Sequence, residues 1–242
     1  MNESELNDLG QPVGRGIAGW KMPLHPSGAP MEGRFCRLER LDPAAHAADL
    51  FEANRMDKQG RNWTYLPYGP FDSLDAYGDW MASTCMGDDP LFFAIVDAEA
   101  RKAVGVASFM RIDAKSGSIE IGHLNFSPLL QKRPAATEAI YMMMARAFEG
   151  GYRRCEWKCN AFNAASRRAA QRFGFSFEGI FRQATVVKGR NRDTAWYSAM
   201  DHEWPALSRA FSAWLHPSNF DEAGRQRECL SAATRPLLAS TG

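Results

Sequence analysis

The sequence predicts an α+β fold in which a mixed sheet of about seven strands is flanked by helices. Two helical segments come first, and an antiparallel meander of short strands follows them. A strand, a loop and a helix then occupy residues 118–149 and lead into another strand. That order places the two strands parallel to each other, since a crossover helix connects parallel strands. With 242 residues and 45% hydrophobic content, the chain can bury the core of one large domain.

The ends of the chain differ from its middle. Residues 1–33 are rich in Gly and Pro and lack periodicity, so we expect an N-terminal arm. Residues 34–215 carry the strand and helix patterns and form the predicted domain. Residues 216–242 form a tail with little pattern beyond a helix expected over 221–231.

The predicted domain opens with a strand over residues 35–41. Asp42 is a suitable N-cap and Pro43 a suitable first residue for a helix reaching Met56, and Ser73 caps a second helix to about Met86. The loop between them, residues 62–71, carries four aromatic side chains. Aromatic loops either pack over a core or line a pocket, and the sequence leaves both readings open.

Strands are predicted over residues 91–97 and 103–110, and residues 118–126 follow as a central strand. In that strand Ile119 and Ile121 share one face while Glu120 takes the other. Pro134 fits the first position of a helix ending at Glu149, so the preceding loop should direct backbone N–H groups and a helix dipole outward. Such a loop is suited to phosphate.

The last predicted elements of the domain are a strand, a short helix and a hairpin. Residues 154–159 form the strand, residues 163–173 the helix, and residues 175–188 and 194–200 the hairpin, joined across 189–193.

Composition excludes several classes of function. A net charge of +1 gives no reason to expect a nucleic-acid partner, and no apolar run is long enough to span a membrane. The first twenty residues lack the pattern of a signal peptide, so a cytoplasmic location is expected. Five cysteines at irregular spacing indicate reduced thiols, and we expect no metal site because no second Cys or His pair accompanies Cys155 and Cys159.

Four segments carry the most specific motifs: the strand containing EIG (120–122), QKRPAA (131–136), NAAS (163–166) and RFGF (172–175). In their order and spacing they resemble the GNAT superfamily of N-acetyltransferases, especially its RimJ/RimL-type branch, and the resemblance covers residues 34–205. The family's pyrophosphate motif is Q/R-x-x-G-x-G/A, in which Pro134 replaces the first glycine here. The resemblance implies a strongly twisted sheet whose two central parallel strands splay apart, with acetyl-CoA as cosubstrate in the opening.

The resemblance also implies which residues hold the cosubstrate. Backbone groups of the central strand would pair with the pantetheine arm, and the loop with the helix start would bind the pyrophosphate. Asn163 would bind pantetheine or position water, although an N-cap role explains it equally well. The implied set comprises Leu124, Asn125, Phe126, Gln131, Lys132, Arg133, Ala135, Ala136, Thr137 and Asn163.

Two residues are candidates for proton transfer in the implied reaction. Glu120 lies eleven residues before Gln131, the spacing at which histone-acetylating relatives place a general base. A surface or ion-paired carboxylate is the alternative reading of Glu120. Ser166 matches the residue proposed to protonate the leaving thiolate in RimL-like enzymes, with a polar first-turn residue as its alternative. No cysteine has a convincing nucleophile setting, so direct transfer in a ternary complex is expected.

The acceptor is a primary amine in each enzymatic reading. The branch implies a protein N-terminal α-amine, and a small-molecule amine such as an antibiotic or polyamine is the alternative. Deprotonating a lysine amine at pH 7 costs about 4–5 kcal/mol, against about 1 kcal/mol for an α-amine. A non-catalytic acyl-CoA-binding sensor is the third hypothesis, and the chain could be a monomer or a homodimer.

Overall fold

The computed structural model describes residues 4–242, and its centre is a mixed sheet of eight strands in the order β3-β4-β5-β6-β7-β8-β10-β9. Every neighbouring pair is antiparallel except β7 and β8, which are parallel as predicted. The count exceeds the expected seven because Met31–Glu32 pairs with β4 although it lies within the expected arm. The strands are β3 (Met31–Glu32), β4 (Cys36–Arg40), β5 (Leu91–Asp97), β6 (Ala103–Asp113), β7 (Ser118–Phe126), β8 (Arg154–Asn160), β9 (Ser176–Val187) and β10 (Arg190–Met200).

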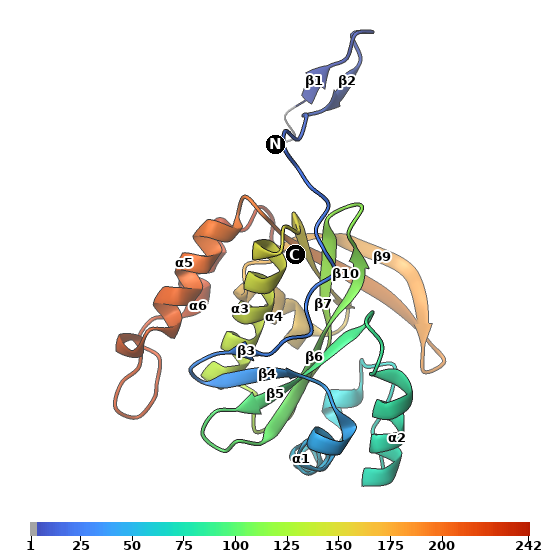
Figure 1. The fold of residues 1–242 in the computed structure, drawn as a ribbon, viewed down its shortest axis with the longest axis vertical. Helices are drawn as coiled ribbons and strands as arrows, with labels where there is room; N and C mark the ends of the chain where they lie inside the picture. The colour runs from blue at the N-terminus through green and yellow to red at the C-terminus, as the bar shows by residue number, and fades with distance from the viewer. Residues whose placement is uncertain (1–3) are drawn as a thin grey trace.

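Helices cover both faces of the sheet (Figure 1). On one face α3 lies over β7 and β8 with α5 beside it, and α4 covers β8 and β9. On the other face α1 packs on β6 and against α2. Each face has its own apolar core, centred on Ile119 and Ile121 under α3 and on Leu50 and Phe92 under α1 and α2. The helices are α1 (Pro43–Arg55), α2 (Leu74–Thr84), α3 (Pro134–Glu149), α4 (Ala164–Arg172), α5 (Trp204–Leu215) and α6 (Leu230–Thr234).

Local capping signals in the sequence explain where several helices begin. The Asp42 side chain accepts a hydrogen bond from the Ala44 N–H at 3.0 Å, and the Ser73 hydroxyl accepts one from the Ala76 N–H at 3.1 Å. Both predicted N-caps are therefore confirmed. Pro134 is the first residue of α3, and the predicted bounds of this helix match the structure.

The central parallel strands splay apart, as the resemblance implies. β7 and β8 pair only from Ser118 to Glu120 on the β7 side, and both continue without pairing to each other. A register shift between β6 and β7 accompanies this separation, and His123 takes a positive φ of 50° beside it. The bulge increases local twist and turns the second half of β7 away from β8.

The chain ends and the late hairpin depart from the predictions. The turn between β9 and β10 is tighter than the expected 189–193, because Arg190 to Arg192 already pair with β9. The prediction of a helix over residues 221–231 is wrong, since only Leu230–Thr234 forms an α-helix in that part of the tail. Near the other end a two-stranded hairpin, β1 (Ser4–Leu6) with β2 (Pro12–Gly14), extends from the body (Figure 1).

Within residues 4–242, no helix has both the length and the apolar character to cross a membrane.

Candidate active site

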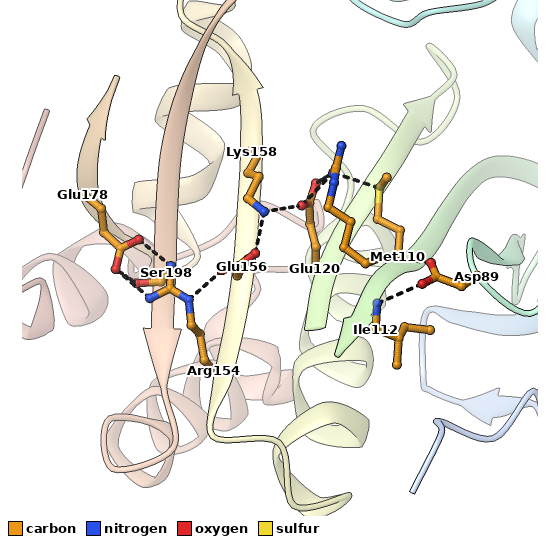
Figure 2. A network of polar contacts seen from close by, with 10 residues as sticks. Asp89, Met110, Ile112, Glu120, Arg154, Glu156, Lys158, Glu178 and Ser198 are labelled. Atoms are coloured by element: carbon orange, nitrogen blue, oxygen red, sulfur yellow. Dashed lines mark hydrogen bonds and ion pairs between the residues drawn. The ribbon is translucent and has the colours of Figure 1, made fainter. Parts of the chain in front are cut away.

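A buried ion-pair cluster lies where β7 and β8 separate. Lys158 on β8 points between Glu120 on β7 and Glu156 on its own strand (Figure 2). Its ammonium group lies 3.0 Å from the Glu120 carboxylate and 2.6 Å from that of Glu156. Arg111 on β6 contacts both Glu120 oxygens, at 2.8 and 2.9 Å. Because the side chains of Glu120 and Lys158 are only 3% and 8% exposed, these charges depend on one another for compensation.

The cluster continues across the sheet as an alternating row of charges. Arg154 donates to Glu156 at 2.6 Å and makes two contacts with Glu178 on β9, which also accepts a hydrogen bond from Ser198 (Figure 2). Burial favours the neutral form of Glu156, yet the hydrogen bonds and charges of Lys158 and Arg154 outweigh it and lower the pKa of this carboxyl. Glu156 is therefore ionised at neutral pH.

His123 lies in an aromatic environment next to this cluster. Its ring stacks on Tyr68, with ring centroids 5.6 Å apart, and its Nδ1 lies 3.1 Å from the Tyr68 hydroxyl. Phe92 packs against it from β5. Burial, together with the cations Arg111 and Arg192, lowers the pKa of His123 to about 4. The imidazole is thus neutral at physiological pH.

The aromatic loop, residues 62–71, both packs over the core and borders the site. Trp63 is buried against Phe71 and Tyr77. The Tyr65 hydroxyl instead donates to the Phe162 carbonyl, which lies just beyond β8, at 3.2 Å. From the tip of the β9–β10 hairpin, the Lys188 ammonium donates to the carbonyls of Trp63 and Gly69. The loop therefore connects the two sides of the opening.

A separate cavity of about 370 Å³ lies beside this loop. Its lining comes from the end of α1, the turn before Trp63, Pro70, Phe71 and Tyr77. No residue of the predicted site lines it, so the cavity is distinct from the opening between β7 and β8.

The loop before α3 offers fewer backbone donors than expected. The Gln131 N–H donates to the Ser127 carbonyl, and the N–H groups of Arg133 and Ala136 donate within the turn. Pro134 has no N–H. In the part of the chain that the structure describes, this leaves the N–H groups of Lys132, Ala135 and Thr137 without an acceptor outside the helix. The Arg133 side chain does not cap α3, and both Lys132 and Arg133 are exposed.

The side chain of Gln131 fastens the loop to the strand. Its amide donates to the Phe126 carbonyl at 2.8 Å and to the Asn62 side chain at 2.9 Å. Asn62 donates to the same Phe126 carbonyl at 3.1 Å. That carbonyl therefore already has two donors, and the backbone groups at Leu124 and Asn125 are better placed to pair with a ligand.

Asn125 has an unusual environment for a buried amide. It is 3% exposed, and neither its side-chain oxygen nor its nitrogen has a hydrogen-bond partner among residues 4–242. Buried polar atoms are almost always paired, so this residue calls for a partner from outside the chain or from water.

Ser166 and Asn163 lie together at the start of α4. The Asn163 side chain accepts a hydrogen bond from the Ser166 N–H at 3.1 Å, so its N-cap role is present in the structure. The Ser166 hydroxyl accepts one from Trp157 Nε1 at 2.9 Å. Burial raises the pKa of the neighbouring Cys159 thiol, against a hydrogen bond from Ser166 that acts in the opposite sense. The thiol is neutral and is a weak nucleophile in this state.

Three cations near Glu120 are absent from the residues predicted from the sequence. Lys158, Arg111 and Arg192 come from three different strands. Alternation along residues 154–160 places Glu156 and Lys158 on one face of β8, and the parallel register then sets that face beside Glu120. Only the register, which the sequence does not reveal, brings these residues together.

The comparisons with known proteins agree with this geometry. A family model described as an acetyltransferase (GNAT) domain matches residues 36–176. A GCN5-related N-acetyltransferase from Brucella melitensis is 46% identical, with 90% of this chain and 99% of that chain covered at a TM-score of 0.88. A probable GNAT-family acetyltransferase from Chromobacterium violaceum ATCC 12472 is 43% identical, with coverages of 81% and 98% and a TM-score of 0.75. No curated protein matches the sequence.

A more distant structural likeness concerns the fold alone. The Microcin C7 self-immunity acetyltransferase MccE, solved with acetyl-CoA and AMP, is 21% identical, covering 69% of this chain and 93% of that chain at a TM-score of 0.61.

The family match spans more than half of the sequence, so the chain belongs to the GNAT acetyltransferase family. It is an acetyltransferase, and acetyl-CoA is its cosubstrate.

Proposed function

We propose that this protein transfers the acetyl group of acetyl-CoA to a primary amine by direct attack within a ternary complex. The observation that carries the proposal is the separation of β7 from β8 directly after Glu120. The buried Glu120 carboxylate lies where the unpaired edge of β7 begins, and the start of α3 follows the far end of the same strand. Each supplies one requirement of acyl transfer: binding, charge stabilisation and proton removal.

The residues around the opening fit the cosubstrate. The N–H groups of Lys132, Ala135 and Thr137 at the start of α3, with the exposed charges of Lys132 and Arg133, suit a diphosphate. Backbone groups of Leu124 and Asn125 suit an extended amide-containing arm, which would add to β7 as a strand does. The unpartnered Asn125 amide favours such a ligand over an empty edge. When bound, the thioester supplies the activated acetyl group.

Glu120 is the proposed base and Ser166 the proposed acid. Arg111 and Lys158 hold the Glu120 carboxylate in one orientation beside the strand edge. The Ser166 hydroxyl accepts from Trp157, so its own proton, which it directs to the neighbouring Cys159 thiol, is the one that it would give to the departing thiolate. The Asn163 cap positions Ser166 by fixing the first turn of α4.

We propose an α-amine as the acceptor, as in RimJ/RimL-type enzymes that modify protein N-termini. An α-amine is deprotonated at neutral pH for about 1 kcal/mol, so one carboxylate suffices to complete proton removal. A small-molecule amine is the alternative within the same reaction. A non-catalytic acyl-CoA sensor is the alternative of a different class, and the lost donor at Pro134 favours it.

Two measurements test the proposal. Calorimetric titration with acetyl-CoA tests binding, and thiol release with a panel of peptides and amines tests turnover. Glu120→Gln should slow release, most strongly at low pH, because the amide cannot accept a proton. Arg111→Met is the matched control, since it alters the same ion pair but keeps the carboxylate. Binding without release for any amine would favour the sensor, and equal rates for wild type, Glu120→Gln and Ser166→Ala would refute the assigned roles.

A further inference from the structure

Arg192 borders the opening and lacks a counterion among the residues that the structure describes. It lies on β10, two residues before Thr194 in the sequence. Thr194 pairs with Asn160, the last residue of β8, so Arg192 lies past the end of that strand. The register of β10 against β9 shifts between Arg192 and Thr194. Arg192 lies within electrostatic reach of Glu120 and His123, and further along β10 the Trp196 ring contacts Lys158 of the same cluster. Arg192 is half-buried, and within residues 4–242 its Nε has no hydrogen-bond partner and its guanidinium no ion pair.

The charges of the row that runs from Arg111 to Glu178 already balance one another. Glu120 is shared by Arg111 and Lys158, Glu156 by Lys158 and Arg154, and Glu178 is bound to Arg154. The row thus holds three cations and three anions. Arg192 adds one positive charge to this neutral row.

The two carboxylates nearest to Arg192, those of Asp193 and Glu120, already bind other groups. Asp193 accepts hydrogen bonds from the Gln183 N–H at 2.7 Å and from the Asn191 side chain at 3.0 Å. Burial lowers the pKa of Arg192, and the charges of Glu120 and Arg111 act on it in opposite senses. Arg192 is therefore within electrostatic reach of Glu120, whose carboxylate is bound by two other cations.

A surplus cation has consequences for an amine acceptor. An amine arrives largely as an ammonium ion, which a local excess of positive charge repels. A half-buried guanidinium without a counterion is also unfavourable, and an anionic ligand group relieves both costs. Trp196 adds a second unpaired donor, Nε1, on the same strand.

We propose that the acceptor carries a carboxylate close to its reactive amine, and that Arg192 binds this carboxylate. The inference rests on the proposed function and narrows its acceptor class. The carboxylate can belong to a free amino acid or to an acidic residue next to a peptide N-terminus. In either source it neutralises Arg192 while the amine lies beside Glu120.

The test compares matched acceptors that differ in the acidic group. Serine is compared with ethanolamine, and a peptide beginning Ser-Asp with one beginning Ser-Asn, each as the ratio of kcat/KM with and without the carboxylate. For the wild type we expect a ratio on the order of 10- to 100-fold in one pair, since a hydrogen-bonded charged contact has that strength. The pair that shows the preference identifies the source.

Variants then assign the preference to one side chain. Arg192→Gln should bring the ratio close to one, and Arg192→Lys should restore part of it because it keeps the charge but not the planar fork. Arg190→Gln, which removes an exposed cation two residues away, should keep the wild-type ratio. Thermal melting of each variant confirms that it is folded, and the KM for acetyl-CoA should not change in Arg192→Gln.

The outcomes separate this inference from the proposed function. Transfer to all four acceptors with ratios near one, or a preference that survives in Arg192→Gln, would overturn the role of Arg192 alone. A raised KM for acetyl-CoA in Arg192→Gln with an unchanged ratio would assign the residue to the cosubstrate and likewise overturn it. Acetyl-CoA binding without transfer to any acceptor would overturn the proposed function as well.

Discussion

Acidification should destabilise the protein through His123, whose pKa lies near 4 in the folded state against an ordinary value of 6.5. The unfolded chain takes up a proton below pH 6.5, whereas the folded chain keeps the imidazole neutral until about pH 4. Stability is therefore lost as the pH falls through this window. The two values correspond to a loss of about 2 kcal/mol between pH 7 and pH 5 from this residue alone.

The comparison uses His123→Asn, because asparagine tolerates the positive φ of this position and does not titrate in this range. Urea unfolding of both proteins at pH 7 and pH 5 gives the free energy of unfolding, and the other four histidines contribute equally to each. The wild type should lose about 2 kcal/mol more than the variant. Equal losses, or an NMR titration of His123 with a midpoint near 6.5, would refute the reasoning.

Two further predictions concern the ion-pair cluster and the start of α4. Lys158→Met leaves two buried carboxylates short of a cation and should cost about 3–5 kcal/mol in urea unfolding at pH 7, against about 1 kcal/mol for Arg111→Met, whose side chain is 58% exposed. A smaller loss for Lys158→Met than for Arg111→Met would contradict this ranking. Asn163→Ala should cost about 1 kcal/mol through the lost cap, and thiol release should slow with it because Ser166 is no longer fixed; unchanged stability would show that the cap is not needed.

Much of the fold could be predicted because its signals are local. Strand β7 and helix α3 have the predicted bounds, since alternation, Pro134 and the glycines after Glu149 act within a few residues. Helix α5 is not among the predicted elements, although Leu207, Phe211 and Trp214 recur at helical spacing. Strand β3 could not be predicted from two residues, because only its pairing with β4 defines it.

The candidate site also has one part that local sequence signals predict and another that they do not. Asn163 can be predicted as a helix cap from its own position, and the structure shows that bond. The partners of Glu120 and the contacts of Gln131 cannot, because Lys158 and Asn62 lie far away in sequence and meet them only through the strand register and a loop crossing. A residue type indicates what a side chain can do, whereas its partners follow from the tertiary structure.

A crystal structure of the complex with acetyl-CoA would show whether the cosubstrate occupies the opening between β7 and β8. We expect the pantetheine arm between β7 and β8 beyond Glu120, along Leu124 and Asn125, with the diphosphate at the N–H groups that begin at Lys132. Acetyl-CoA bound elsewhere, such as in the cavity beside Trp63, with the opening between β7 and β8 filled by side chains, would contradict this expectation.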